Sequence, residues 1–276
     1  MAANRVMRVI GEGRMALGGL TGSFTGAAIV ELMGHSGLDA ALVDLEHNGI
    51  DLSQVQVMII AADAVGITPI VRIPELDRPL ITRLLDMGAQ GIQLDGIQDA
   101  AQAAALVDAV RFPPEGSRGL IWNSRSARYG SVDKRTYAEE ANRRTLVKIS
   151  IDDPRGVEEV DAIAAVAGVD IIGVGAHDLS STLGVVGEPD HPLLNAAIDR
   201  VIDAVTRHGP GRLALPLDSS AYPRSATDLH RLGVAYTNLQ PHPEQRLLRS
   251  LREQVVGARG ASSIESPRDV EDRGNG

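Results

Sequence analysis

Short apolar runs alternate with amphipathic segments along most of the chain, and turn residues such as glycine separate them. This pattern predicts strands that alternate with helices of 3.6-residue periodicity. The expected strands cover residues 16–20, 40–44, 69–73, 91–95, 146–151, 170–175, 212–217 and 235–240. Eight strands, each followed by a helix, favour a (β/α)8 TIM barrel, with an open doubly wound sheet as the alternative.

Capping residues and apolar periodicity predict helices in the rest of the chain. Thr25 is expected to cap the first helix after a strand, and the last helix is expected over residues 243–255. Residues 112–141 break the alternation with a loop rich in Gly, Pro, Ser and Arg, which is typical of a loop that covers a site or an interface. We therefore expect one barrel domain over residues 1–256, and a disordered polar tail over residues 257–276.

Composition restricts the chemistry. The chain has 276 residues, a formal net charge of −9 and no cysteine, so disulfides, thiolate nucleophiles and sulfur-ligated zinc are excluded. No apolar run is long enough to cross a bilayer and no signal peptide pattern opens the sequence, which predicts a cytoplasmic protein. The chain has no basic patch with interleaved aromatic residues, and this argues against a nucleic-acid partner.

The stretch 168–184, GVDIIGVGAHDLSSTLG, is the strongest candidate for chemistry. An apolar run ends in a glycine turn that would bring Asp178 to the C-terminal mouth of a barrel. The backbone of Gly175, Ala176 and His177 can then face an anionic ligand, while Asp178 offers oxygen to a hard cation. The alternative is that Asp178 caps a helix beginning at Leu179.

Polar residues follow the ends of the other expected strands, where a barrel enzyme carries its active site. In chain order they are Asp44, Glu46, His47, Arg72, Asp95, Ser150, Asp152, Asp153, Asn238 and Gln240. Carboxylates from the fifth and sixth strands, Asp152 and Asp178, can share one divalent cation such as Mg²⁺ or Mn²⁺.

Two basic residues complete this set. Arg72 matches a carboxylate through paired hydrogen bonds, and His47, oriented by Asp44 or Glu46, is suited to proton transfer near neutral pH. Together these groups predict proton transfer or carbon–carbon cleavage next to the carbonyl of a 2-oxo acid.

Each residue also has a purely structural interpretation. His47 can be an exposed loop histidine, and Arg72 can pair with Glu75 or Asp77. Asp152, like the aspartate that follows it, can cap the next helix. The functional hypothesis depends on all of these residues meeting at one end of one barrel.

Lys148 raises a separate question, because the chain contains only two lysines and the other is Lys134. The two-residue period of a strand places Lys148 on the same side as Ser150, facing the barrel interior. A buried lysine needs compensation, which Asp95 or Gln93 on the neighbouring strand can supply. We favour this structural pairing, although a desolvated lysine also suits Schiff-base chemistry.

Several blocks of the sequence together resemble the HpcH/HpaI family of metal-dependent class II pyruvate aldolases. The family includes 4-hydroxy-2-oxoheptane-1,7-dioate aldolase and 2-keto-3-deoxy-rhamnonate aldolase. The blocks are LVDLEH, PIVRIP, LLDMGAQGI, RFPPEGSRG, VGAHDLSSTLG and GEPDHP. They occur in order between about residues 16 and 255, and this series is more specific for the fold than for the substrate.

The resemblance implies a TIM barrel of the phosphoenolpyruvate/pyruvate-binding type, assembled as a hexamer from three dimers. It also implies a divalent cation, Mg²⁺, Mn²⁺ or Co²⁺, that binds pyruvate in a reversible aldol reaction with an aldehyde. By position, His47 matches the catalytic base, Asp86 its carboxylate partner from a neighbouring subunit, and Arg72 the arginine that stabilises pyruvate. Asp178 and Asp152 match the two metal ligands.

Some positions depart from the family pattern. Family members read VQVE where this chain reads ISID, so Ser150 replaces a pyruvate-contacting glutamine and Asp152 a longer glutamate. His177 stands in the metal loop, and Asp95 replaces an apolar ending of the fourth strand. We therefore predict a metal-dependent aldolase acting on a 2-oxo acid. The alternative is a divergent member that performs decarboxylation, condensation or Lys148 imine chemistry in a specialised pathway, or a binding protein without activity.

Overall fold

Strands and helices alternate along the chain in the computed structural model, which describes residues 4–259. The strands are β1 (Ala16–Leu20), β2 (Ala40–Asp44), β3 (Thr68–Ile73), β4 (Gly91–Leu94), β5 (Leu146–Ile151), β6 (Ile171–Val174), β7 (Leu213–Ala214) and β8 (Tyr236–Asn238). The first helices are α1 (Arg5–Gly11), α2 (Ala27–His35), α3 (Leu52–Val65), α4 (Arg78–Met87), α5 (Ala100–Val110) and α6 (Lys134–Arg144), with the 3-10 turn η1 (Arg128–Gly130) before α6. The later helices are α7 (Pro154–Glu158), α8 (Val160–Ala164), α9 (Ala176–Thr182), α10 (Pro192–Arg207), α11 (Ala226–Arg231) and α12 (Pro243–Arg259).

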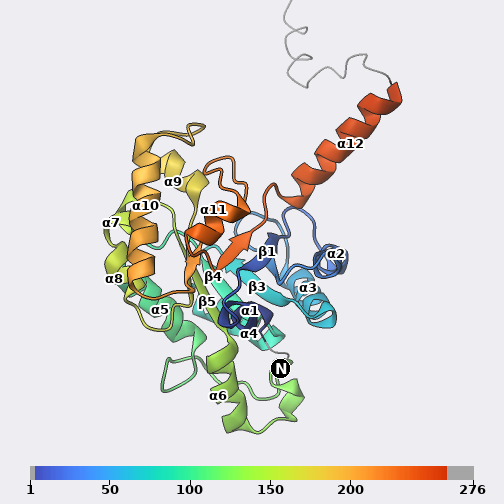
Figure 1. Ribbon diagram of the computed structural model, residues 1–276. Helices are drawn as coiled ribbons and strands as arrows, with labels where there is room; N and C mark the ends of the chain where they lie inside the picture. The colour runs from blue at the N-terminus through green and yellow to red at the C-terminus, as the bar shows by residue number, and fades with distance from the viewer. Residues whose placement is uncertain (1–3, 260–276) are drawn as a thin grey trace, which may run out of the picture.

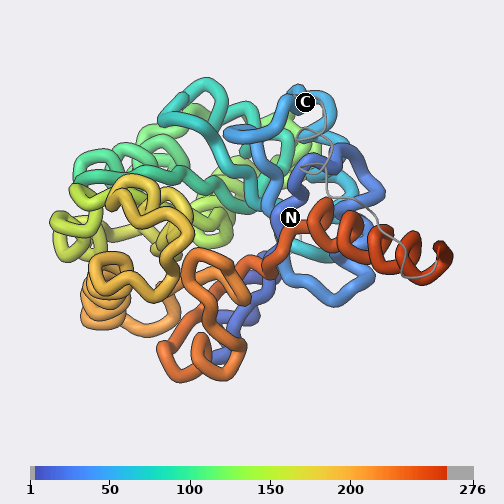
Figure 2. Tube along the Cα trace, turned by 90° about the horizontal axis from the view of Figure 1, so that it is seen from above, coloured from blue at the N-terminus to red at the C-terminus, as the bar shows by residue number. Residues whose placement is uncertain are grey.

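The eight strands close into one parallel barrel in sequence order, with helices arranged around it (Figures 1 and 2). Closure is made by β1 and β8, whose register aligns Ala16 with Tyr236. This confirms the predicted (β/α)8 barrel and excludes the open sheet, in which the first and last strands would not pair.

Helix α1 closes the N-terminal end of the barrel. Its Val6 and Val9 are buried against inward side chains at the starts of the strands. The Asn4 amide fastens this helix by donating to the backbone carbonyls of Gln90 and Arg144, each at 2.9 Å. The N-terminal end of the barrel interior is therefore filled by side chains, which leaves the C-terminal mouth as the open end.

Some predicted element boundaries were wrong. Gly26 rather than Thr25 is the N-cap of α2, and α9 begins at Ala176, so Asp178 lies in its first turn and is not its cap. Part of the long loop 112–141 belongs to α6.

Helix α12 continues through Arg259, so the expected tail does not begin at residue 257. The rest of the expected tail, residues 260–276, lies outside the described residues. Figures 1 and 2 show α12 projecting away from the barrel. No helix within residues 4–259 has the length and apolar character needed to span a membrane.

Candidate active site at the barrel mouth

A cavity of about 240 Å³ opens among the C-terminal ends of the strands. Most of the predicted site residues line it, namely His47, Arg72, Ser150, Gly175, Ala176, His177 and Asp178. Asp152 and Asp86 are not among the lining residues. Seven of the predicted site residues therefore lie at one cavity, and the remaining two positions need separate description.

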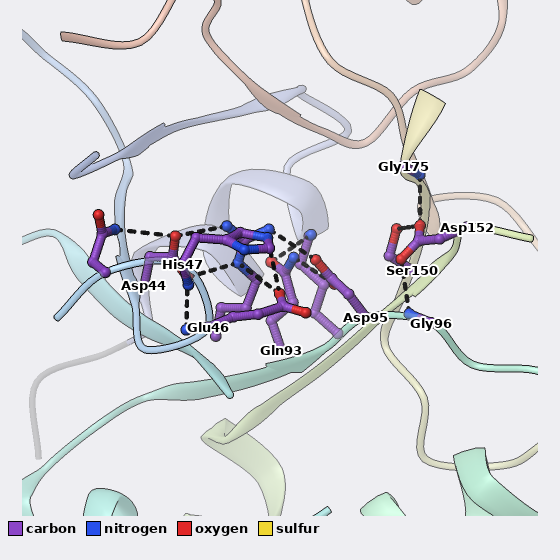
Figure 3. Close-up of polar contacts among 12 residues, drawn as sticks. Asp44, Glu46, His47, Gln93, Asp95, Gly96, Ser150, Asp152 and Gly175 are labelled. Atoms are coloured by element: carbon purple, nitrogen blue, oxygen red, sulfur yellow. Dashed lines mark hydrogen bonds and ion pairs between the residues drawn. The ribbon is translucent and has the colours of Figure 1, made fainter. Parts of the chain in front are cut away.

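Arg72 is the centre of the charged network on one side of the cavity. Figure 3 shows its carboxylate partners Asp44, Glu46 and Asp95 grouped there. It holds Asp44 with two hydrogen bonds, Nε to Oδ1 at 3.0 Å and Nη2 to Oδ2 at 2.7 Å. Its Nη1 donates to Asp95 Oδ2 at 3.0 Å, and Nε lies 3.3 Å from Glu46 Oε2. Burial raises the pKa of Asp44, but its bonds to Arg72 outweigh this and lower it overall. Arg72 therefore pairs with these carboxylates and not with Glu75 or Asp77.

His47 lies beside this network with its ring exposed on the cavity wall. Its Nε2 is 3.5 Å from Glu46 Oε2, and its backbone N–H donates to Asp44 Oδ1 at 3.3 Å. Burial, followed by repulsion from Asp95, raises the pKa of Glu46. An imidazole beside a carboxylate is suited to accept a proton and to be held in one orientation.

A chain of hydrogen bonds runs from Asp95 through Gln93 to Lys148. Gln93 Nε2 donates to Asp95 Oδ1 at 2.7 Å, and Lys148 Nζ donates to Gln93 Oε1 at 2.6 Å. This bond confirms the predicted pairing of Lys148 with a residue of the neighbouring strand, which is Gln93. Burial lowers the pKa of Lys148 to about 8, although Asp95 partly opposes the shift.

Asp152 is held by three hydrogen bonds apart from the Arg72 network (Figure 3). Its Oδ1 accepts from Ser150 Oγ at 2.6 Å and from the Gly175 N–H at 2.9 Å, and its Oδ2 accepts from the Gly96 N–H at 2.7 Å. It does not cap a helix, because Asp153 is the N-cap of α7. Burial, followed by repulsion from Asp95, raises the pKa of Asp152 to about 6, and the nearby Asp178 adds to the shift.

The charges of this region fit a bound cation. Its carboxylates are Asp44, Glu46, Asp95, Asp152 and Asp178, and its buried cations are Arg72 and Lys148. The excess of carboxylates favours a hard divalent ion with oxygen ligands. Among the described residues, Asp152 Oδ2 accepts one hydrogen bond, so it keeps a lone pair for such an ion. Within residues 4–259, no three His, Asp or Glu side chains are grouped to hold a metal unaided, so water or ligand oxygens would have to complete its coordination.

Asp86 lies near the C-terminal end of α4, away from the cavity of its own chain. Its Oδ1 accepts a hydrogen bond from Arg118 Nη2 at 2.8 Å. Burial raises the pKa of Asp86, and the attraction of Arg118 opposes that shift. The structure of one chain does not bring Asp86 to His47, so the predicted pairing of these two residues would require a second subunit.

Sequence reasoning missed three polar side chains that line the cavity, Ser219, Tyr236 and His242. Tyr236 lies within a predicted strand, but it looked like an ordinary apolar strand residue. His242 follows Gln240, a predicted site residue, and its Nε2 lies 3.2 Å from the Gln240 amide nitrogen. Burial lowers the pKa of His242. The position of His242 just after the eighth strand was a signal that could have identified it.

Fold and site together define a barrel enzyme whose charged cavity lies at the C-terminal mouth. Comparison with known proteins agrees. Residues 23–233 match the family model described as HpcH/HpaI aldolase/citrate lyase. A hydroxypyruvate/pyruvate aldolase of Roseobacter denitrificans is 34% identical over 189 residues, which cover 68% of this chain and 73% of that protein.

Solved structures give the same result. An HpcH/HpaI aldolase/citrate lyase family protein from Burkholderia cenocepacia J2315 has a TM-score of 0.82 at 29% identity, covering 92% of this chain and 98% of that one. The citrate synthase SbnG has a TM-score of 0.80 at 26% identity, covering 94% and 98%. The chain therefore belongs to the HpcH/HpaI aldolase/citrate lyase family, which confirms the predicted family and the prediction of a lyase-type enzyme. Members of this family generally depend on a divalent metal.

Proposed function

We propose that this enzyme catalyses reversible aldol cleavage of a 2-oxo acid and releases pyruvate or a pyruvate-like enolate. The observation that carries the proposal is the meeting of His47, Arg72 and Asp178 on the wall of one small cavity. These groups supply a base, a carboxylate-binding cation and an oxygen ligand for a metal. The related Roseobacter protein, named a hydroxypyruvate/pyruvate aldolase, supports the same reaction class.

The substrate carboxylate is proposed to bind at Arg72. Three of the five N–H groups of this side chain are bonded to Asp44 and Asp95, so two remain for a ligand. The backbone of Ala176 and His177 is proposed to assist, whereas the Gly175 N–H already donates to Asp152. Ser150 lies on the cavity wall and is proposed to contact the substrate, although its hydroxyl hydrogen is donated to Asp152.

Asp152 and Asp178 are the proposed ligands of Mg²⁺, Mn²⁺ or Co²⁺. When bound, such a cation would polarise the substrate carbonyl and stabilise negative charge on its oxygen. His47, steadied by Glu46, is proposed to move the proton during cleavage and its reversal. Asp86 of a neighbouring subunit is proposed to assist His47.

The test measures deuterium exchange at C3 of pyruvate in D₂O by NMR, because enolate formation precedes any encounter with the unidentified aldehyde. Metal-free protein is compared with protein given Mg²⁺, Mn²⁺ or Co²⁺. We expect the cation to raise the exchange rate by about 10²-fold or more, since it stabilises the developing charge. His47→Gln should abolish this increase, whereas His208→Gln, far from the cavity on the turn after α10, should not. An exchange rate that no metal changes would refute the proposed metal-dependent reaction.

A second candidate is another carbon–carbon bond reaction, such as decarboxylation or condensation. The observation that favours it is the hydrogen bond from the Ser150 hydroxyl to Asp152. In the family that this sequence resembles, the residue at this position is a glutamine that contacts pyruvate. The structural similarity to a citrate synthase supports this candidate. Incubation with oxaloacetate distinguishes the two reactions. Release of CO₂ from oxaloacetate at a higher rate than cleavage of an aldol substrate would favour decarboxylation.

The enzyme is proposed to be a cytoplasmic homo-oligomer, a trimer of dimers. Helix α12 has no buried residue, yet it exposes an apolar stripe of Leu247, Leu248, Leu251 and Val255 on one face. Exposed fractions of 37–51% for these side chains leave a surface that a second copy would cover.

This assembly predicts that Leu248→Glu combined with Leu251→Glu lowers the oligomeric state, because the charges would lie inside the interface. Light scattering coupled to gel filtration measures the change. Arg249→Glu, on the opposite face of α12, is the matched control and should leave the mass unchanged. A double variant that keeps the parent mass would exclude α12 as the contact.

A further inference from the structure

Lys148 is a buried amine at the floor of the cavity, and the mechanism proposed above does not use it. It projects from β5 into the barrel and is 4% exposed, yet it lines the cavity. The cavity reaches this depth beside positions with little or no side chain, Gly173 on β6 and Ala214 on β7. A small ligand entering from the mouth can therefore reach the amine.

The hydrogen-bond partners of Lys148 do not match a charged ammonium. An ammonium has three N–H donors, and buried donors without acceptors are costly. Within the described chain, Nζ has one hydrogen-bond acceptor, Gln93 Oε1 at 2.6 Å. Its other close contact is the Tyr236 ring, with Nζ 5.4 Å from the centroid. Asp95 is one residue further along the chain of bonds and does not contact Nζ.

The Gln93 amide is held in the orientation that presents its oxygen to Lys148. Its nitrogen donates to Asp95 Oδ1, and Asp95 is in turn held through Oδ2 by Arg72. Lys148 Nζ therefore has one fixed acceptor, Gln93 Oε1, and one aromatic face, the Tyr236 ring. These surroundings suit a nitrogen that carries a single N–H and a positive charge. A protonated imine is such a nitrogen.

We propose that Lys148 forms an imine with the carbonyl group of a small 2-oxo acid at the floor of the cavity, without a metal. The ammonium first releases one proton, and the lone pair of the free Lys148 amine attacks the ketone carbon to give a carbinolamine. The released proton returns to the carbinolamine oxygen, which leaves as water with two of the three original ammonium protons and gives an iminium ion. The third proton stays on nitrogen and is donated to Gln93 Oε1, so total charge and protons balance.

This reaction goes beyond the proposed metal-dependent cleavage, because Lys148 binds the carbonyl carbon covalently and at a different depth in the cavity. The retained positive charge keeps its contact with the Tyr236 ring. The lowered pKa of Lys148 supplies more free amine near neutral pH than an exposed lysine would have. Lys134, the other lysine, is exposed and lies over the Trp122 ring, so it is an internal control.

The experiment treats the full-length enzyme with EDTA, then with pyruvate and sodium borohydride, and maps the modified residue by peptide mass spectrometry. We expect one reduced pyruvate adduct at Lys148, in at least tenfold excess over Lys134. Lys134→Arg should keep the full yield, and Lys148→Arg should lose it while remaining folded by circular dichroism.

Equal labelling of both lysines, or no adduct at Lys148, would overturn the imine proposal. The metal-stimulated exchange of pyruvate C3 protons is measured on the same preparation before EDTA is added. Exchange without an adduct removes only the imine, whereas an adduct without metal-stimulated exchange removes only the metal-dependent reaction. The two proposals therefore fail independently.

Discussion

Asp178→Asn is expected to lower metal-stimulated exchange of pyruvate C3 protons by about 10²-fold, to near the rate of the metal-free protein. The carboxylate lies on the cavity wall in the first turn of α9, and it is the proposed ligand that directly faces the substrate. The amide keeps the shape of the side chain but removes its negative charge, so the cation is held more weakly. Loss of the cation would remove several kcal/mol of charge stabilisation from enolate formation.

Thermal unfolding with and without Mn²⁺ separates this effect from a loss of fold. The parent enzyme should gain stability on adding Mn²⁺, because a ligand that binds only the native state stabilises it. Asp178→Asn should unfold at nearly the parent temperature without metal and gain little when metal is added. Asp203→Asn, on the exposed face of α10, is the matched control and should behave as the parent does. Full exchange activity in Asp178→Asn would exclude this residue as a metal ligand.

Arg72→Met is expected to lower the free energy of unfolding by about 3–5 kcal/mol at neutral pH, because it leaves buried carboxylates without their cation. Asp44 and Asp95 have side chains only 2% and 12% exposed, and both are hydrogen-bonded to Arg72. Urea denaturation measures the loss. Arg72→Lys should lose less stability, since it keeps the charge, but it cannot hold Asp44 with two bonds.

The loss should depend on pH. The lowered pKa of Asp44 means that Arg72 stabilises its ionised form. This contribution is complete above its unfolded pKa of about 3.8 and disappears as the pH falls through the lower folded value. The stability difference between the parent and Arg72→Met should therefore narrow in acid. A difference that is small at pH 7, or that widens in acid, would contradict the assigned network.

The strands were predictable because each is an apolar run with clear boundaries. The bounds of β2 and β5 agree with the prediction, whereas β7 is shorter, Leu213–Ala214 instead of residues 212–217. Pro216 explains the difference, because it has no N–H to continue the ladder. Leu217 beyond it forms only an isolated bridge to Leu239.

The polar partners depended on register, which the sequence alone does not give. Parallel pairing aligns Asp44 with Arg72 and Gln93 with Lys148. The sequence identified these residues as candidates at strand ends, but whether Arg72 would pair with a neighbouring strand or with its own loop was open. The interior position of Lys148 could be predicted, because the two-residue period places it on the same face as Ser150, a predicted site residue.

The site at Asp152 could be predicted least well. Its chemistry suggested a metal ligand, but its three hydrogen bonds involve Ser150 and the loop backbones of Gly96 and Gly175, which come together only when the barrel closes. The role of Asp86 likewise cannot be tested in one chain, because its proposed partner belongs to another subunit. Both assignments remain predictions.

The most direct test of the account is the anomalous difference map of a crystal soaked with Mn²⁺ and pyruvate. We predict a manganese peak in contact with carboxylate oxygens of both Asp178 and Asp152, with pyruvate oxygens completing its coordination. A peak elsewhere, or no peak at this position in a crystal whose cavity holds pyruvate, would contradict the proposed metal site.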